Sequence, residues 1–517
     1  MPDIDDYQTF DAFLKHWAAE KPDAVSLENN GRITTFAQLD DTTRRMISVL
    51  EARGIAKGDR VAWLGKNVDI FYMMFLACAR MGAVAVPIGW RLARPEVAYI
   101  LSDTQATLII TGEGFDDAAA AAAADVEHTV TVLPEAAFRA EIADASSAQY
   151  DPSAPDDPVL QLYTSGTTGN PKGAELTNRS LLGLRKYSRE QKLEWADYRP
   201  DDCMLVAMPC AHIGGTGIVV AAVSNGIKAL IQEEFEPGAF LEGIEAGATH
   251  MFIVPAALQM VITHPRAKEA DFSSVRYLMY GAAPIPLELL REAVKTMPDA
   301  GMLQVYGMTE TSGSVTALPP EDHSLEGNQR MRSAGKALPG VEVRIVGPDD
   351  EELPRGEIGE IAIRSPSNMK GYWRLPDATR GTLRDGWIRT GDAATMDEDG
   401  YVYIQDRMKD MIISGGENVY PAQVESAIYG HPAIAEVAVI GVPDEKWGEA
   451  VKACIVAKPG MSVEEGDVIA WARERLAGFK VPKSIDIIPA LPRNASGKIL
   501  RRELRAPYWE GRERQVN

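Results

Sequence analysis

The sequence predicts an α/β protein whose sheets are mostly parallel and covered by helices. Short apolar runs alternate with polar or amphipathic stretches, and six of these runs are typical of buried strands: RVAWLG, AVAVPI, TLIIT, CMLVAMP, KALIQ and HMFIVP. Strands buried on both faces are continuously apolar, and strands that alternate with helices pair in parallel. Near residue 335 this alternation of apolar runs and helical stretches ends, and a different pattern follows.

Shorter elements follow this change. The segments VEVRIVG, GEIAIRS, GWIRTGD and GYVYIQD are separated by Gly and Asp turns, which predicts a small β-rich region. From residue 410 the pattern predicts a compact α+β unit, with a strand in MIISGG, a helix at 421–429, strands in AEVAVIGV and KACIVA, and a helix at 464–477.

Charge and cysteine usage exclude several classes of function. The 517 residues carry 53 Lys and Arg against 74 Asp and Glu, a net charge of −21. Affinity for nucleic acids and anionic membranes depends on clustered basic residues, so neither is an expected partner. The four cysteines lie far apart without a CxxC pair, which argues against a zinc site and against a secreted disulfide framework.

The sequence offers no targeting or membrane segment. Its first residues lack the basic and apolar regions of a signal peptide. The longest apolar run, residues 70–79, is far shorter than the roughly 20 residues that span a bilayer. We therefore expect a soluble, cytoplasmic protein.

One region departs from the acidic average. Residues 471–505 hold nine basic residues against three acidic ones. Two interpretations stay open: a solvated cationic face, or a surface that attracts a small polyanion such as a nucleotide, pyrophosphate or coenzyme A.

The most informative stretch is YTSGTTGNPKG at residues 163–173, directly after the apolar segment VLQL. Gly166 and Gly169 allow backbone N–H groups to approach an anion, the hydroxyls donate further hydrogen bonds, and Lys172 adds a positive charge. The pattern is not a Walker A loop, because a proline precedes the lysine and a glycine follows it, and GxGxxG is absent. It predicts a phosphate-binding loop of another kind.

With further motifs in order, the chain resembles the superfamily of acyl-adenylate-forming enzymes, in particular its fatty-acid and aryl-acid CoA synthetases. YGMTE at 306–310 matches the family's YGxTE, WIRTGD at 387–392 its RTGD and DRMKD at 406–410 its hinge motif, and GGENVYP at 415–421 and PRNASGK at 492–498 complete the set. The resemblance implies two stacked α/β sheet subdomains and a small β-barrel-like piece in residues 1–405. A mobile α+β domain at 406–517 would follow, with the active site at the junction.

The resemblance also implies an ATP site built from several motifs. The expected contacts to ATP or AMP are Thr164, Ser165, Gly166, Thr167, Thr168, Gly169, Lys172, Gly281, Ala282, Ala283, Tyr306, Gly307, Asp392 and Arg407. Tyr306 would stack on adenine, and Asp392, backed by Arg407, would accept the ribose hydroxyls. Glu310 would hold Mg²⁺ near the phosphates, with the Thr309 hydroxyl at the α-phosphate.

The catalytic residues implied by the family are Lys498, Thr309, Glu310 and His212. A carboxylate that attacks the α-phosphate brings two anions together, and the mobile Lys498 would stabilise that charge by a few kcal/mol. His212 would gate the acyl carboxylate. Lys409 would be the hinge, and Gly415 and Gly416 would form a wall of the pantetheine tunnel, where glycine leaves room for a narrow thiol arm.

The implied reaction joins a carboxylic acid to coenzyme A through an acyl-AMP, with release of AMP and pyrophosphate from MgATP. The acyl pocket is expected around His212, Tyr280, Val305 and Met308, among mostly apolar neighbours. Many aryl and fatty acyl ligases have glycine at the position of Val305, so the branched side chain should narrow or reshape the channel. We expect a hydrophobic aliphatic or alicyclic acid.

Three alternatives stay open. An aryl acid is the nearest rival substrate, and a carrier protein could accept the acyl group in place of coenzyme A. A non-catalytic nucleotide sensor is disfavoured by the joint presence of Thr164, Lys172, Glu310, Asp392, Arg407 and Lys498. The sequence does not fix the oligomeric state, and a homodimer stays open.

Overall fold

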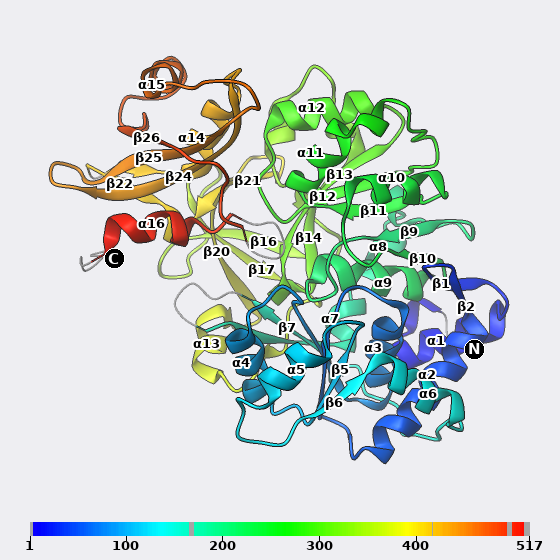
Figure 1. The fold of residues 1–517 in the computed structure, drawn as a ribbon. Coiled ribbons are helices and arrows are strands. Elements are labelled where there is room, and N and C mark those ends of the chain that lie inside the picture. The colour runs from blue at the N-terminus through cyan, green and yellow to red at the C-terminus, as the bar shows by residue number, and fades with distance from the viewer. Residues whose placement is uncertain (1–3, 165–169, 416, 494–498, 511–517) are drawn as a thin grey trace.

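The computed structural model describes residues 4–164, 170–415, 417–493 and 499–510. Among these residues the strands form four sheets (Figure 1). Two large sheets with helices on their faces make up most of the chain, a small antiparallel sheet follows, and a fourth sheet lies in the C-terminal part, drawn in orange and red. The predicted α/β fold class is confirmed.

The first large sheet is parallel at its centre. Its order is β15 (Lys336–Ala337), β14 (Gly313–Leu318), β13 (Gly301–Met308), β12 (Tyr277–Gly281), β11 (His250–Ile253), β9 (Cys203–Val206), β10 (Lys228–Ile231), β1 (Val25–Asn29) and β2 (Arg32–Thr35). Strands β13, β12, β11, β9, β10 and β1 pair in parallel, whereas β14, β15 and β2 are antiparallel to their neighbours.

The second large sheet is also mostly parallel, with antiparallel strands at one edge. Its order is β18 (Gly371–Tyr372), β8 (Lys172–Thr177), β7 (Pro158–Thr164), β4 (Val84–Ile88), β3 (Arg60–Leu64), β5 (Leu108–Thr111) and β6 (Thr131–Pro134). All six apolar runs predicted as buried strands form parallel ladders in one of these two sheets. The alternation of apolar runs with helices therefore predicted the sheets correctly.

The helices fill the space between the sheets and cover their outer faces. Their bounds are α1 (Phe10–Glu20), α2 (Phe36–Ala52), α3 (Asp69–Met81), α4 (Arg94–Thr104), α5 (Asp116–Ala123), α6 (Glu135–Asp144), α7 (Asn178–Leu182), α8 (Arg185–Glu190), α9 (Ile213–Asn225), α10 (Pro237–Glu245), α11 (Pro255–Thr263), α12 (Leu287–Thr296), α13 (Pro376–Thr382), α14 (Pro421–Tyr429), α15 (Glu465–Arg473) and α16 (Arg501–Trp509). Helices α10, α11 and α12 pack on the first sheet, and α4 and α5 on the second.

Helix α3 lies between the two sheets. Every one of its residues is buried, and it contacts β1 of the first sheet and β4 and β7 of the second. A helix that is apolar on all sides is either a core helix or a membrane span. Here the apolar run at 70–79 is a core helix, and none of the helices in the described part of the chain is long and apolar enough to cross a membrane.

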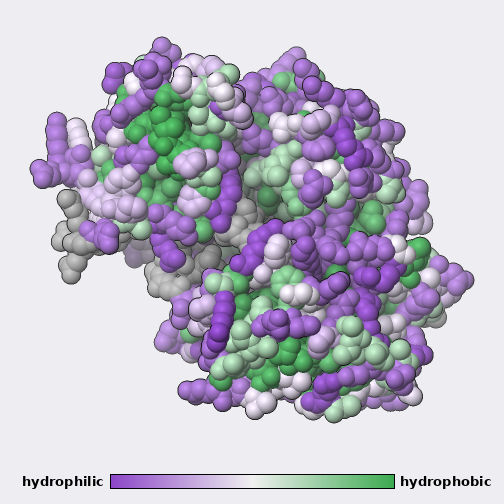
Figure 2. All heavy atoms as spheres, viewed as in Figure 1, coloured by the Kyte–Doolittle hydropathy of each residue, from purple (hydrophilic) through white to green (hydrophobic). Residues whose placement is uncertain are grey.

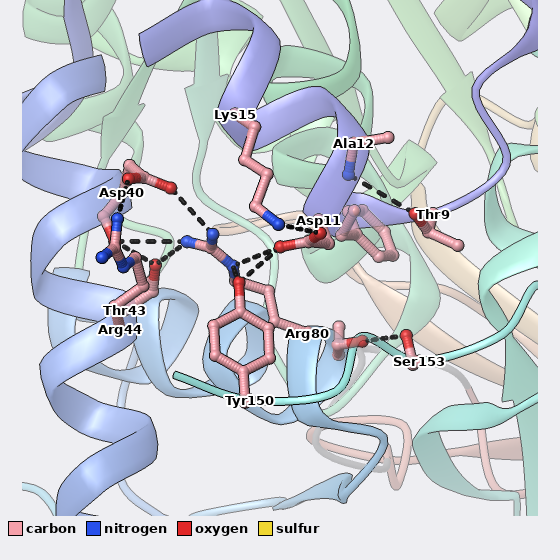
Figure 3. A network of polar contacts seen from close by, with 12 residues as sticks. Thr9, Asp11, Ala12, Lys15, Asp40, Thr43, Arg44, Arg80, Tyr150 and Ser153 are labelled. Atoms are coloured by element: carbon pink, nitrogen blue, oxygen red, sulfur yellow. Dashed lines mark hydrogen bonds and ion pairs between the residues drawn. The ribbon is translucent and has the colours of Figure 1, made fainter. Parts of the chain in front are cut away.

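Arg80 lies near the end of α3 and is fully buried within a polar network (Figure 3). Its guanidinium lies 3.0 Å from Asp11 Oδ1 and 2.8 Å from Asp40 Oδ1. It also donates hydrogen bonds to Tyr150 Oη and Thr43 Oγ1, at 2.7 and 2.8 Å. A buried charge is tolerated only when it is paired and hydrogen bonded, and Arg80 meets both conditions. The network also connects α1, which carries Asp11, α2, which carries Asp40 and Thr43, and α3.

The small antiparallel sheet connects the large sheets to the C-terminal part. It runs β16 (Glu342–Val346), β17 (Gly359–Arg364), β20 (Trp387–Met396) and β19 (Leu383–Arg384), and β21 (Val402–Arg407) also pairs with β20. The domain boundary predicted between residues 405 and 406 falls inside β21, whose last residues still pair with β20.

The C-terminal part is the predicted α+β unit. Its sheet runs β23 (Glu417–Val419), β22 (Ile412–Ser414), β25 (Gly448–Ala457) and β24 (Ile434–Asp444), with β26 (Ser484–Ile487) parallel to β25. Helix α14 has the predicted bounds. The helix predicted at 464–477 spans only Glu465–Arg473, and a single further turn, closed by the bonds from the amides of Arg475 and Leu476 to the carbonyl of Ala472, follows it.

The surface is mostly hydrophilic on the face shown in Figure 2, and apolar residues gather in separate groups, one of them in the C-terminal part below α15. Part of the predicted cationic region is neutralised within the C-terminal part. Arg501 forms a bidentate pair with Glu425, and Arg493 lies 2.7 Å from Glu436. The excess of basic residues at 471–505 is therefore smaller at the surface than in the sequence.

Candidate active site

The phosphate-binding motif begins and ends on an antiparallel hairpin. Strands β7 and β8 pair in antiparallel register up to Thr164 and Lys172. Helix α4 holds both sides of the loop, because Tyr99 donates a hydrogen bond to the carbonyl of Pro171 at 3.1 Å and Tyr163 donates one to Asp103. The loop itself, with the predicted contacts Ser165, Gly166, Thr167, Thr168 and Gly169, lies outside the described residues.

Glu310 meets the base of this hairpin. It lies on the short helix η4 (Thr309–Thr311), directly after β13, and is only 5% exposed. Its Oε1 accepts hydrogen bonds from Thr164 Oγ1 at 3.4 Å and from Tyr372 Oη at 2.7 Å. The ammonium group of Lys172 lies 4.4 Å from the centre of the Tyr372 ring. The structure thus brings the expected phosphate and metal residues together, with Thr309 beside them.

The donor set at Glu310 fits a magnesium ion that is shared with phosphates. Mg²⁺ prefers oxygen ligands and is usually held by one or two carboxylates, substrate phosphates and water. Glu310 supplies a carboxylate and Thr164 a hydroxyl at the same point. In the part of the chain that the structure describes, no three His, Cys, Asp or Glu side chains gather into a metal-binding group.

Asp392 and its partners form the expected ribose end. Asp392 is 5% exposed; its Oδ2 accepts a hydrogen bond from Tyr306 Oη at 2.7 Å, and its Oδ1 lies 2.7 Å from Arg407 Nε. Burial works against the charged guanidinium and is the largest single effect, but the charge of Asp392, together with those of Tyr306, Glu310 and Asp410, outweighs it and raises the pKa of Arg407. Burial and Asp392 both raise the pKa of Tyr306, so its hydroxyl stays protonated and donates.

The expected adenine wall lies at the end of β12 and across β13. A side chain at Gly281 would collide with the carbonyl oxygen of Val305, and one at Gly307 with the carbonyl oxygen of Gly313. These glycines therefore allow β13 to approach its two neighbours closely. Ala282 has a positive φ of 64°, and both it and Ala283 are exposed, so this turn is strained and open to solvent.

His212 caps α9 at the end of the segment that follows β9. Burial lowers its pKa to about 4, and its side chain makes no capping hydrogen bond to the helix. The preceding segment is anchored by Asn67, which accepts from the Cys210 amide at 2.7 Å and donates to the Met208 carbonyl at 3.0 Å. The sequence motifs missed Asn67, although its position just after β3 places it at the carboxyl edge of a parallel sheet, where sites form.

The residues expected at the acyl pocket differ in exposure. Val305 and Met308 on β13 are half-buried. Tyr280 has no exposed surface, and its hydroxyl contacts Gln304 Oε1 at 3.2 Å and His323 Nε2 at 2.8 Å. This leaves Tyr280 no free surface for an acyl chain in this conformation. Phe252 was not predicted, yet its half-buried ring lies against Gly214, two residues after His212.

The predicted hinge lies where β21 gives way to η7 (Met408–Asp410), which contains Lys409. Asp406 fastens this point to the C-terminal part, because its carboxylate accepts hydrogen bonds from the amides of Arg407 and Ala422, at 2.7 and 2.8 Å. Burial raises the pKa of Asp406 to about 6, although the charge of Arg501 opposes this.

The loop expected to line the thiol tunnel follows β22. Gly415 has a φ of +64°, and a side chain there would collide with the ring of Trp447. Its amide donates to the carbonyl of Trp447 at 2.8 Å. The other predicted residues of this half of the site, Gly416 and Lys498, lie outside the described residues.

Known protein families match most of this chain. The family model described as AMP-binding enzyme matches residues 14–373, and the one described as AMP-binding enzyme C-terminal domain matches residues 423–498. The fatty acid–[acyl-carrier-protein] ligase ScoC of Streptomyces coeruleorubidus is 41% identical over 503 residues, which cover 97% of this chain and 96% of that protein.

Two further proteins are similar along nearly their whole length. A feruloyl-CoA synthase of an Amycolatopsis species is 41% identical over 496 residues, 95% of this chain and 97% of that protein. The crystal structure of ATP-bound MatB from Rhodopseudomonas palustris has a TM-score of 0.87 at 33% identity, and the match covers 97% of this chain and 99% of that one. The chain belongs to the AMP-binding enzyme family and is an AMP-forming acid–thiol ligase.

Proposed function

We propose that this enzyme joins a hydrophobic carboxylic acid to coenzyme A through an acyl-AMP intermediate. One observation carries the proposal: β13 connects the two ends of a nucleotide site. Tyr306 on this strand bonds to Asp392, and Glu310 directly after it meets Thr164 and Tyr372. The negative charge of Glu310 also contributes to the raised pKa of Arg407. The Glu310 end and the Asp392 end of the site therefore lie close enough for their charges to interact.

These placements support the following first half-reaction. The substrate carboxylate attacks the α-phosphorus of ATP, and pyrophosphate leaves. Lys172 and the loop before it would bind the phosphates, while Asp392 would hold the ribose hydroxyls. Glu310 would hold Mg²⁺, which supplies charge neutralisation at the phosphates when bound. Lys498 would lie between carboxylate and α-phosphate during the attack.

In the second half-reaction, the thiol sulfur attacks the acyl carbon and AMP leaves. We assign His212 to the acyl carboxylate, because its lowered pKa of about 4 keeps it neutral at physiological pH and able to accept or donate one hydrogen bond. Rotation of residues 406–517 about Lys409 would withdraw Lys498 and bring Gly415 and Gly416 to the thiol path.

The proposed acid is aliphatic or alicyclic, because Val305, Met308 and Phe252 are apolar and half-buried near the end of the strands that form the nucleotide site. The similarity to a feruloyl-CoA synthase favours an aryl acid as the second candidate. The similarity to a fatty acid–[acyl-carrier-protein] ligase favours a carrier protein as the second candidate acceptor.

A two-stage assay tests the proposal. ATP–pyrophosphate exchange is measured over straight-chain acids of increasing length, cyclohexanecarboxylic acid, benzoic acid and cinnamic acid, with amino acids as the negative set. The best acid is then offered with either coenzyme A or a phosphopantetheinylated carrier protein. We expect exchange with an apolar acid and transfer to coenzyme A. Exchange with none of the acids would contradict the proposed reaction.

A further inference from the structure

Tyr372 contacts two of the residues assigned to ATP. It is 6% exposed and lies on β18, next to β8. Its hydroxyl donates to Glu310 Oε1 at 2.7 Å, and its ring lies under the ammonium group of Lys172, 4.4 Å from the ring centre. Lys172 and Glu310 come from separate sheets, so this ring is a direct link between them.

The backbone around Tyr372 is fixed to both partners. The amide of Met369 donates to the carbonyl of Glu310 at 2.8 Å, and the amide of Trp373 donates to the carbonyl of Gly173 at 2.8 Å. Tyr372 itself is held by its own amide, which donates to Thr379 Oγ1 at 2.9 Å. Because backbone bonds hold the strand on both sides, the ring has little freedom to move away from Glu310 or Lys172.

The hydrogen bonds at Glu310 are unequal between its two oxygens. Oε1 accepts from both Tyr372 Oη and Thr164 Oγ1, whereas Oε2 has no hydrogen-bond partner among the described residues. Two donors at one oxygen fix the rotation of the carboxylate and leave the other oxygen available to a cation. Partners that orient a metal ligand in this way commonly change metal affinity by about 10- to 100-fold when they are removed.

We infer that Tyr372 is a positioning residue for the metal–nucleotide complex: its hydroxyl orients Glu310 toward the ion, and its ring holds Lys172 toward the phosphates. The inference rests on the proposed role of Glu310 in MgATP binding. A cation over an aromatic ring within about 6 Å is attracted to it, so the ring places the lysine without neutralising its charge.

Tyr372→Phe separates the two contacts, because it removes the hydroxyl and keeps the ring under Lys172. The matched control is Tyr401→Phe. Tyr401 is 4% exposed and donates to Asp322 Oδ2 at 2.6 Å, so it loses an equivalent hydrogen bond to a carboxylate away from the assigned nucleotide residues. Both variants are measured without any acid substrate, so that no turnover occurs.

The readout is binding of Mn²⁺ in the presence of ATP, titrated by electron paramagnetic resonance, together with ATP binding in EDTA by calorimetry. We expect Tyr372→Phe to raise the Mn²⁺ dissociation constant about tenfold or more, with metal-free ATP affinity within twofold of the wild type. Tyr401→Phe should change neither quantity by more than twofold.

Wild-type Mn²⁺ affinity in Tyr372→Phe would overturn the inference, and so would an equal loss in Tyr401→Phe. These results are independent of the exchange assay. If no acid supports exchange while Tyr372→Phe still weakens Mn²⁺ binding, the proposed reaction is wrong and the positioning role stands.

Discussion

Arg407, the last residue of β21, pairs with Asp392 across the ladder to β20, with 2.7 Å between Nε and Oδ1. The next residue in the chain begins η7, where we propose the hinge. The carboxylate assigned to the ribose is therefore paired with Arg407, two residues before the proposed hinge Lys409. Rotation of the C-terminal part would start beside the bound nucleotide.

Arg407→Met should weaken ATP use. It leaves Asp392 without its cation but with its hydrogen bond from Tyr306, and a hydrogen bond to a charged group contributes about 1.5–3 kcal/mol. We expect KM for ATP to rise about 10- to 100-fold, with KM for the acid little changed. Steady-state exchange kinetics measure both. Arg389→Met is the control, because Arg389 lies on β20, the strand of Asp392, but pairs with Glu360. Equal effects of the two variants would remove the ribose assignment.

Lys498→Ala should separate the half-reactions. The attack on the α-phosphate brings two anions together, whereas the thiol step does not, so only the first needs this cation. We expect acyl-AMP formation to fall at least about a hundredfold, while supplied acyl-AMP is still converted to the thioester at near the wild-type rate. The exposed Lys458, changed to Ala, is the control. Equal loss in both half-reactions would contradict separate roles for the two conformations.

Val305→Gly should change the choice of acid. Removing three carbons from a half-buried position on β13 opens space beside Gly281, and one methylene in such a pocket changes discrimination by about 1–3 kcal/mol. We expect kcat/KM to shift toward longer or bulkier acids with KM for ATP little altered.

The control for this change is Val343→Gly. Val343 is a half-buried strand valine in the small sheet, so its substitution reports the general effect of glycine in a strand. The measurement is kcat/KM over the acid panel of the exchange assay. An unchanged ranking of acids in Val305→Gly would mean that Val305 does not line the channel.

His212 should contribute to the loss of stability in acid. Burial lowers its pKa from 6.5 to about 4, so between these values the unfolded chain binds a proton that the folded one does not. The free energy of unfolding therefore falls as the pH is lowered from about 6.5 to about 4. His212→Gln cannot bind that proton, so its melting temperature should fall less steeply over this range. Parallel melting curves for wild type and variant would show that His212 is not buried as a neutral ring.

Arg80→Met should destabilise the fold without affecting the site. It removes the fully buried guanidinium from Asp11 and Asp40, which keep only their exposed-side partners Lys15 and Arg44. Breaking a buried pair costs about 3–5 kcal/mol, and we expect a loss near the lower end of this range. Arg179→Met removes an exposed pair with Asp156 and should cost less than about 1 kcal/mol. Denaturant midpoints compare the two, and KM for ATP should match the wild type in both. Equal midpoints for the two variants would mean that the buried network contributes little.

Local patterns in the sequence predicted the strands and the order of the site motifs. The six apolar runs form parallel strands, as predicted. A strand that is buried on both faces needs apolar side chains at consecutive positions, so a continuous apolar run is visible in the sequence. Helix α14 also has its predicted bounds, since a proline begins it and a glycine follows it. Of the residues picked out by the motifs, Thr164 ends β7 and Glu310 directly follows β13, whereas Asp392 lies within β20.

Contacts between distant segments were decided only by the tertiary structure. Tyr372 carries no motif signal for its bonds to Glu310 and Lys172, because these depend on how β18 is aligned beside β8. Tyr280 also shows that a motif does not fix a side chain's surroundings. It lies next to a motif expected to line the pocket, but the alternation of side chains along β12 places it in the core. A sequence pattern fixes which residues are apolar, charged or free to bend, whereas the register between strands fixes which of them meet.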